Sequence, residues 1–186
     1  MKKHIFTSIT YTLITAIVLG LGYPLALTAL AHFAFPAKAN GQLLYNAKGD
    51  LVGSAIIGQA FISDRYFHSR PSAAGTGYDA SSSSGSNLGP TSKVLADRIQ
   101  QSAASEKQGN VPVDLVTTSA SGLDPDITPA AALFQVPRIS RARGVSEGEL
   151  RSLINTHTSS RQLGILGEPR VNVLLLNQSM GSDTGH

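Results

Sequence analysis

The chain has 186 residues, with 15 Lys and Arg against 12 Asp and Glu, and it contains no cysteine. The lack of cysteine excludes disulfides, thiolate zinc sites and cysteine nucleophiles. Without Lys2 and Lys3, which precede a long apolar run, 13 basic residues face 12 acidic ones. No basic block or alternation of basic and aromatic residues indicates nucleic-acid binding.

The apolar run comes first in the chain, and residues 4–37 include no Asp, Glu, Lys or Arg. About 20 apolar residues in a helix cross the ~30 Å hydrocarbon core of a bilayer, where a helix satisfies its own backbone groups. We therefore predict one N-terminal transmembrane helix within residues 1–36, followed by a single soluble domain in residues 37–186. The alternative is a cleaved signal peptide, since Ala37-Lys38-Ala39 has the small-x-small form of a cleavage site, but a signal's apolar region spans only about 7–15 residues.

Only a few charged residues flank this helix, and the prediction of its orientation depends on them. Lys2 and Lys3 precede it and Lys38 and Lys48 follow it, so the positive-inside bias is small. A long C-terminal domain can be translocated regardless of its charges. We predict a single-pass protein of the bacterial inner (plasma) membrane, with a cytoplasmic N-terminus and an extracytoplasmic domain.

Small residues recur within the apolar run. Ala16 and Gly20 are four residues apart, as are Gly22 and Ala26, and this spacing lets another helix approach closely in lipid. Small residues are also common in membrane helices that make no such contact. Pro24 removes a backbone hydrogen bond and is expected to kink the helix. A kinked helix with a small-residue face predicts packing against other subunits.

The first half of the domain reads as a hairpin followed by loops and one helix. Residues 42–46 and 51–57 predict two strands around the turn at Lys48-Gly49-Asp50. Residues 80–86 are a serine-rich loop. Pro90 is expected to open a helix, because Val94, Leu95 and Ile99 share one face. Residues 113–116 predict a short strand.

The second half predicts two helices and a buried strand. Thr128 and Pro129 are an N-cap and first-turn pair for a helix through residues 131–135, which Pro137 should kink or end. Ser146 and Glu149 form a capping box before a helix with Leu150, Leu153 and Ile154. Residues 164–169 predict a loop and residues 171–176 a buried strand. Because strands and helices alternate, we predict an α/β or α+β domain.

Motifs for catalysis are missing from the sequence. It has no phosphate-binding P-loop, no dinucleotide fingerprint, no S-x-x-K motif and no H-E-x-x-H zinc motif. The five histidines are scattered, so no metal site is predicted. Asp124 and Asp126 flank Pro125 and are interpreted as turn residues, because a calcium loop needs more oxygen ligands. We predict that this chain alone is not an enzyme.

Three polar, glycine-rich segments are too distinctive for ordinary loops. Read with the N-terminal helix, they resemble KdpC, the single-span subunit of the Kdp potassium-transporting P-type ATPase. One position departs from the family pattern: Asp126 stands where many relatives have histidine or asparagine. The segments that carry the resemblance are Tyr23-Pro24-Leu25, GSAIIGQAF at 53–61, YFHSRPSA at 66–73, GSNLGP at 85–90, the SGLDPDITP and QVPR motifs within 121–138, and GEPRVNVLLLN at 167–177.

The resemblance implies an accessory subunit of an ATP-driven, high-affinity potassium uptake complex. Its implied partners are a potassium-channel-like subunit and an ATP-hydrolysing P-type subunit. The family is described as a catalytic chaperone that raises the hydrolysing subunit's affinity for ATP, so no cofactor is expected to bind this chain firmly and ATP is expected only through the complex. An extracytoplasmic domain cannot reach cytoplasmic ATP, so either the orientation is inverted or coupling passes through the helix to the partners.

Gln135 and Arg138 are the residues we predict for contact with a partner or with nucleotide. They lie three residues apart on one helix face, and they offer an amide and a planar fork of donors. The alternative is a solvated face whose arginine lies near the negative end of the helix dipole. Two functions of other classes stay open: a serine hydrolase, for which only His68 is a nearby base, and a periplasmic binding or scaffold module unrelated to a pump.

Overall fold

The computed structural model of the chain describes residues 2–106 and 109–181. The chain divides into two units, residues 1–43 and residues 44–186. The boundary predicted at residues 36/37 falls in the short helix α3 (Pro36–Ala39), ahead of that division. The two units are described separately below.

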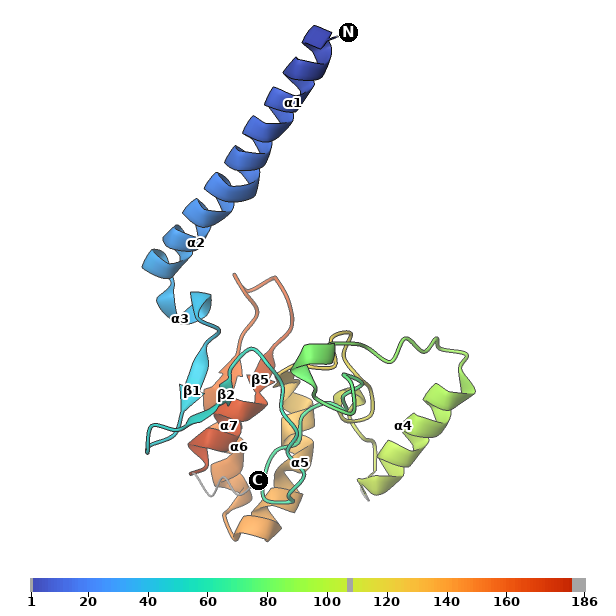
Figure 1. The fold of residues 1–186 in the computed structure, drawn as a ribbon. Helices are drawn as coiled ribbons and strands as arrows, with labels where there is room; N and C mark the ends of the chain where they lie inside the picture. The colour runs from blue at the N-terminus through green and yellow to red at the C-terminus, as the bar shows by residue number, and fades with distance from the viewer. Residues whose placement is uncertain (1, 107–108, 182–186) are drawn as a thin grey trace. The chain divides into compact units, whose positions relative to one another are not determined.

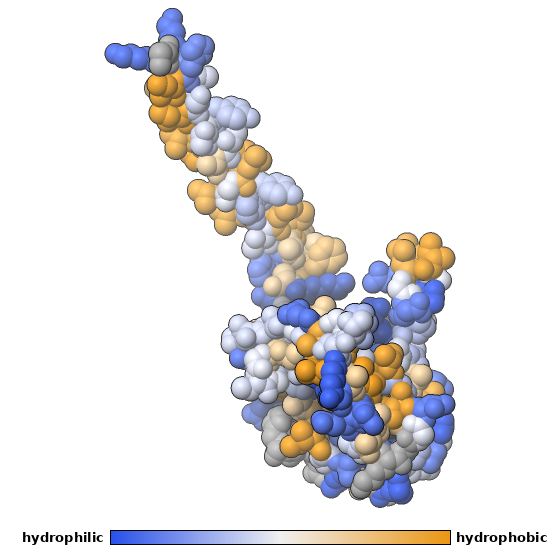
Figure 2. Space-filling view, turned by 90° about the vertical axis from the view of Figure 1, so that its right-hand side faces the viewer, coloured by the Kyte–Doolittle hydropathy of each residue, from blue (hydrophilic) through white to orange (hydrophobic). Residues whose placement is uncertain are grey.

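The first unit is one long helix that continues through three segments: α1 (Lys2–Ile17), a π-helical turn (Val18–Gly22) and α2 (Tyr23–Ala34). Within the described residues it is the one helix long and apolar enough to cross a membrane, with a mean hydropathy of 2.0 and no residue of its most apolar stretch buried. Figure 2 shows apolar surface along most of its length and hydrophilic surface at its start. The predicted apolar helix is confirmed.

Pro24 does not break this helix. Proline has no N–H, so the carbonyl of Gly20 loses its usual donor, and the backbone widens ahead of it into the π-helical turn. In that turn the N–H of Tyr23 donates to the carbonyl of Val18, five residues back. Figure 1 shows α1 and α2 as one continuous rod. The π-helical turn therefore stands where we predicted a kink.

The predicted hairpin is confirmed. Strands β1 (Leu43–Tyr45) and β2 (Leu51–Ser54) pair in a two-stranded sheet. Their turn is closed by Asn46, whose side-chain oxygen accepts from the N–H groups of Lys48 and Asp50, both at 2.9 Å. Gly49 takes a φ of +88°, which glycine adopts without a steric penalty. The second strand ends at Ser54, three residues before the predicted end.

Residues 55–92 form loops that contain one 3-10 turn (Ala80–Ser82), and they lead into α4 (Lys93–Ser105). The helix begins three residues after the predicted start, because Pro90 lies in a turn that the N–H of Ser92 closes on the carbonyl of Gly89 at 3.0 Å. Within the described part of the domain, no residue of α4 is buried. Figure 1 shows this helix standing to one side of the other elements.

The strand predicted at residues 113–116 is wrong. Val113–Leu115 form a 3-10 turn that follows Pro112. The carboxylate of Asp114 accepts from the N–H of Thr128 at 2.8 Å, which holds the turn against the next segment. Leu115 and Val116 face the core while Val113 is exposed, so the apolar run lacked the alternation of a strand.

A small antiparallel sheet of β3 (Asp126–Ile127), β4 (Thr158–Ser159) and β5 (Arg170–Asn172) has the order β3-β5-β4. Helix α5 (Pro129–Arg143) begins as predicted, with the Thr128 hydroxyl accepting from the N–H of Ala131 at 3.2 Å. It continues through Pro137 and ends at Gly144, whose φ of +70° is typical of a helix C-terminus. We predicted that Pro137 would kink or end the helix, and of these two effects the end is wrong.

Two further helices complete the domain. Helix α6 (Glu147–His157) starts at the predicted capping box, where the Ser146 hydroxyl accepts from the N–H of Glu149 at 3.2 Å. The strand predicted at residues 171–176 is correct only to Asn172. Helix α7 (Val173–Ser179) begins there, because the Asn172 side chain accepts from the N–H of Leu175 at 3.1 Å and acts as its N-cap.

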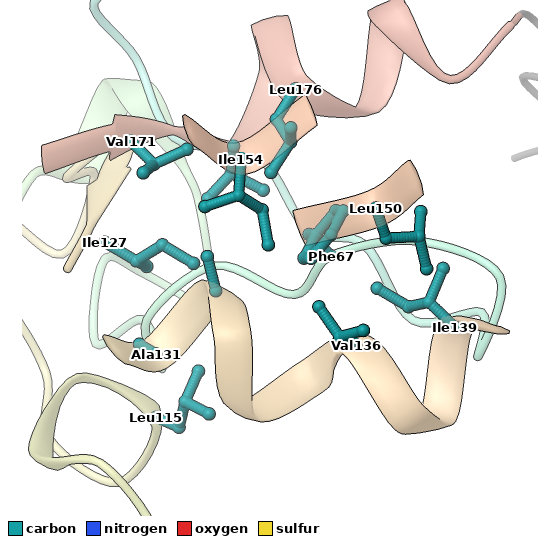
Figure 3. Close-up of a cluster of buried hydrophobic side chains, with 12 residues drawn as sticks. Phe67, Leu115, Ile127, Ala131, Val136, Ile139, Leu150, Ile154, Val171 and Leu176 are labelled. Atoms are coloured by element: carbon teal, nitrogen blue, oxygen red, sulfur yellow. The ribbon is translucent and has the colours of Figure 1, made fainter. Parts of the chain in front are cut away.

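The hydrophobic core lies between α5, α6, α7 and the small sheet. Figure 3 shows side chains of α5 facing those of α6, α7 and β5, with Phe67 among them. The mixed arrangement of helices and an antiparallel sheet confirms the α+β form of the fold prediction. The buried cluster consists of Phe67, Leu115, Ile127, Ala131, Ala132, Val136, Ile139, Leu150, Ile154, Val171, Val173 and Leu176.

Candidate functional site

Residues 66–68, here called the clamped segment, run between α5 and α7. No described strand pairs with this segment, so its backbone groups need other partners. The Asn177 amide accepts from the N–H of Phe67 at 2.9 Å and donates to the carbonyl of Phe67 at 3.0 Å. The Gln135 amide does the same for His68, at 2.7 and 3.1 Å. Two buried side-chain amides therefore take the place of neighbouring strands.

Arg138 adds a third set of bonds to the clamped segment. One guanidinium nitrogen donates to the Gln135 side-chain oxygen at 2.7 Å and to the carbonyl of Tyr66 at 3.0 Å. The other donates to the carbonyl of Asp64 at 2.8 Å. Its side chain is 15% exposed, and burial lowers the pKa of Arg138, against the opposing charges of Glu106 and Asp64.

The exposed side of Arg138 forms part of a cleft, here called the Arg138 cleft, with a volume of about 660 Å³. Burial and then the charge of Arg138 lower the pKa of His68, which favours the neutral imidazole. The ring Nε2 lies 3.1 Å from the carbonyl of Ser63 and donates to it. The cleft has two arginines and two carboxylates in its lining, so it suits a polar or charged protein group. It is lined by Asp64, His68, Ser105, Glu106, Arg138, Arg141 and Ala142.

The structure brings the predicted pair together. Gln135 and Arg138 bond to each other directly, but they differ in exposure. Gln135 is 1% exposed, and its amide bonds to His68, Arg138 and the carbonyl of Ala131. Arg138 is the member of the pair that faces the cleft. Contact of this pair with a partner or with nucleotide stays a prediction.

A second junction joins the loop after the clamped segment to the turn that precedes α5. Arg70 bonds to Asp124 at 3.3 Å and to the Thr117 hydroxyl at 3.3 Å. The Tyr78 hydroxyl donates to the carbonyl of Arg70, and burial raises the pKa of Tyr78 to about 12, so it keeps its proton. Arg70 therefore fixes the position of a turn.

Asp126 pairs with Arg170 of β5 at 3.1 Å. Burial raises the pKa of Asp126, the Arg170 charge lowers it, and the neighbouring Asp124 carboxylate raises it again. The pairing across the small sheet gives this residue a structural role. Asp126 thus ties the turn before α5 to the GEPRVN segment.

Glycines let these segments touch. The N–H of Gly58 donates to the carbonyl of Leu123 at 2.8 Å, and a Cβ at Gly58 would stand 2.5 Å from the carbonyl oxygen of Asp124. Gly122 has a φ of +67°, and a Cβ there would stand 2.5 Å from the carbonyl oxygen of Ser84. Backbones approach so closely that only glycine fits.

Asn172 closes the network on its other side. Its amide donates to the carbonyl of Ala55 at 2.7 Å, which links the start of α7 to the loop after β2. The glycine-rich segments singled out in the sequence therefore converge on one interlocked frame. The sequence analysis did not single out Asn177 as a site residue. The available signal was its position, because Asn177 is a polar residue at the end of the apolar run 173–176.

The small residues of the N-terminal apolar helix lie on its surface. Ala16, Gly20, Gly22 and Pro24 are all exposed. A Cβ at Gly20 would meet no described atom outside its own helix backbone within 4 Å, and one at Gly22 would meet only the carbonyl oxygen of Ile17 at 3.7 Å. This surface is open to another helix. Among the described residues, no cluster of three or more His, Asp or Glu suits a metal ion.

Comparisons with known proteins show the family of this chain. Residues 5–182 match the KdpC family, described as the c chain of the K⁺-transporting ATPase. A potassium-transporting ATPase KdpC subunit of Koribacter versatilis is 57% identical over 95% of this chain and 93% of the relative. The KdpC subunit of Acidobacterium capsulatum is 57% identical over 94% and 96%, and that of Rhodopseudomonas palustris is 51% identical over 97% and 98%. The chain therefore belongs to the KdpC family.

Proposed function

We propose that the chain is a non-catalytic accessory subunit of an ATP-driven potassium uptake complex. The relatives are named as subunits of a potassium-transporting ATPase. The observation that carries the proposal is the use of the family motifs: their polar side chains bond to their own backbone and build a rigid frame. Such a frame presents a surface of fixed shape, which is what a docking subunit needs.

The proposed partners are a potassium-channel-like subunit and an ATP-hydrolysing P-type subunit. The helix Lys2–Ala34 would cross the membrane and pack against them through Ala16, Gly20 and Gly22. In lipid no hydrophobic force drives helices together, so their association depends on close packing. The domain would lie outside the cytoplasm, where the Arg138 cleft would receive a polar group of a partner.

The proposed effect on ATP is indirect. A subunit that binds one state of the pump more tightly than another shifts the pump toward that state. The state that this subunit favours would be the one that binds ATP more tightly. By linkage, binding of this subunit then raises the affinity of the hydrolysing subunit for ATP. A catalytic chaperone of this kind needs no nucleotide site of its own, which accords with the lack of a phosphate-binding motif in the sequence.

The test of the helix contact is Gly20→Leu and, separately, Gly22→Leu. Either change adds bulk to the proposed contact while the helix stays apolar. We expect less co-purification of the partner subunits and failed growth at low external potassium. Leu21→Ile, in the same turn, is the matched control and should assemble normally. Normal assembly and growth of both leucine variants would reduce the helix to a plain anchor.

The test of the domain contact is Arg141→Glu. Arg141 lines the Arg138 cleft, and among the described residues its one hydrogen bond goes to the carbonyl of Pro137 in its own helix turn, at 3.0 Å. The frame should therefore survive the change. We expect a higher KM for ATP in the assembled pump. Arg151→Glu on the exposed face of α6 is the control. An unchanged KM with Arg141→Glu would remove the cleft from the proposed interface.

The alternative function is a scaffold module that is either secreted or anchored. The secreted form differs in the fate of the N-terminus, and the anchored form would purify without larger membrane subunits. We expect intact-mass measurement of the membrane fraction to show that residues 1–39 are retained. A mature chain beginning at Asn40 would contradict the anchor. Protease protection in intact cells would then test the orientation, with cleavage of the domain from outside as the expected result.

A further inference from the structure

The loop between β4 and β5 ends in an exposed cluster of aliphatic side chains, here called the apolar tip. Leu163 is 88% exposed, Ile165 75% and Leu166 54%. Residues 162–167 (QLGILG) contain no charged side chain. Figure 1 shows this loop extending past the end of the small sheet, on the side from which the chain enters β1. Such a concentration of exposed aliphatic surface on a projection indicates a contact.

The loop is built to hold these side chains outward. Gln162 and Leu166 exchange two backbone hydrogen bonds, both at 2.9 Å. An ion pair between Arg161 and Glu168 closes the base of the loop. Gly164 takes a φ of +77°, which forms the tight turn. The exposure of the tip therefore comes from a fixed local structure.

The chain itself keeps its domain close to a bilayer. The apolar helix ends at Ala34 and β1 begins at Leu43. Residues 35–42 span at most ~30 Å when fully extended, and four of them are in the short helix α3. A domain on so short a tether stays beside the membrane that holds the helix.

The chemistry of the tip favours lipid over a protein surface. The cores of protein interfaces are enriched in aromatic residues and arginine, whereas the tip has only leucine and isoleucine. A convex aliphatic projection fits a surface that deforms around it, as the boundary between headgroups and acyl chains does.

We infer that the apolar tip inserts into the interface of the bilayer that carries the chain's own helix. The tip would be a second membrane contact, which fixes the orientation of the domain. This inference rests on the proposed membrane anchor and is independent of any role in potassium uptake.

The test uses the full chain, which contains no tryptophan. Ile165→Trp places one fluorophore in the tip, and Val94→Trp places one on α4 at a site that is 63% exposed. Each variant is reconstituted alone into vesicles of phosphatidylcholine and phosphatidylglycerol, with and without brominated acyl chains. We expect bromine to quench the emission of I165W, which should also be blue-shifted, and to leave V94W unchanged.

Two results would overturn the inference. An unquenched I165W would place the tip in water, and its partner would have to be a protein. Equal quenching of I165W and V94W would mean that the domain has no preferred face toward the lipid. Because no partner subunit is present, neither result depends on whether the proposed pump function is correct.

Discussion

The clamped segment and α4 satisfy their backbones in opposite ways. The clamped segment has no helical or strand hydrogen bonds of its own, and its stability comes from Gln135, Arg138 and Asn177, which lie far along the chain. Helix α4 satisfies its backbone internally, and in the described structure none of its residues is buried. Regular secondary structure therefore does not mark the buried part of this domain: Tyr66 and Phe67 are buried without it, whereas no described residue of α4 is buried.

The difference follows from where the bonds lie. A buried peptide group that loses its partner keeps the full cost of its desolvation, whereas a surface helix exchanges one solvated contact for another. We therefore expect substitutions in the frame around residues 66–68 to cost far more than matched substitutions in α4. Three experiments test that expectation, and they are ordered by the size of the effect.

Gln135→Leu should give the largest effect. It keeps the approximate shape but leaves the N–H and carbonyl of His68 and one bond of Arg138 without their partner. We expect the free energy of unfolding to fall by about 3 kcal/mol. Gln100→Leu on the exposed face of α4 should change it by less than about 0.5 kcal/mol. Denaturant unfolding of both purified full-length variants, with hydrogen exchange of residues 67 and 68, makes the measurement.

Equal stability of the two glutamine variants would contradict the comparison directly. Rapid exchange of residues 67 and 68 in the wild-type chain would do the same, because it would mean that the clamp opens without unfolding the domain.

Gly58→Ala should have an intermediate effect. Its Cβ would meet the backbone of Asp124, which cannot move without disturbing the turn before α5. Overpacking of this kind costs about 1–3 kcal/mol. Gly148→Ala in α6, where a Cβ meets no described atom within 4 Å, should instead stabilise the chain by roughly 0.5–1 kcal/mol. Thermal unfolding of the pair would show opposite signs, and a neutral Gly58→Ala would disprove the tight approach.

The smallest effect concerns pH. Burial and the Arg138 charge lower the pKa of His68 in the folded chain. Below about pH 6.5, the usual pKa of histidine, the unfolded chain therefore binds more protons at this site, and folding stability is lost as the pH falls from 7 toward the lower folded pKa. The nearby Asp64 carboxylate opposes part of this shift.

His68→Gln should remove that part of the pH dependence. Its side-chain amide can donate to the Ser63 carbonyl, as the imidazole does. We expect the free energy of unfolding of the variant to fall less between pH 7 and pH 5, by at most about 1.4 kcal/mol per pH unit. Urea unfolding of wild type and variant across this range makes the comparison. Identical slopes would show that His68 titrates alike in the folded and unfolded chain.

Local signals in the sequence predicted local structure well. The hairpin turn at Asn46–Asp50 and the capped starts of α5 and α6 each depend on residues within one turn of each other. The apolar helix was predicted from one continuous run of uncharged residues. The strand predicted through residue 176 was wrong because an apolar run buried on all sides has no period that separates strand from helix. The side chain of Asn172 caps α7 and so makes the residues that follow it helical.

The frame around the clamped segment lay beyond such signals. Gln135 and Arg138 could be placed on one helix face from their spacing, but their bonds reach back to residues 64–68. Nothing in the local pattern says that an amide will pair with a backbone 67 residues away. The same holds for Arg70 and Arg170, whose carboxylate partners only the folded chain brings close.

The bonds of Asn177 to Phe67 join residues 110 positions apart. Synthesis proceeds from the N-terminus, so the apolar helix leaves the ribosome long before residue 177 exists. Until then the backbone N–H and carbonyl of Phe67 lack the Asn177 amide that bonds to them. Contacts between residues so distant in the chain also form slowly. Folding of this domain can therefore be completed only after α7 has been synthesised. A nascent chain cut short before α7 would hold the apolar helix and a domain that lacks Asn177, so the backbone of Phe67 would have no amide partner from α7.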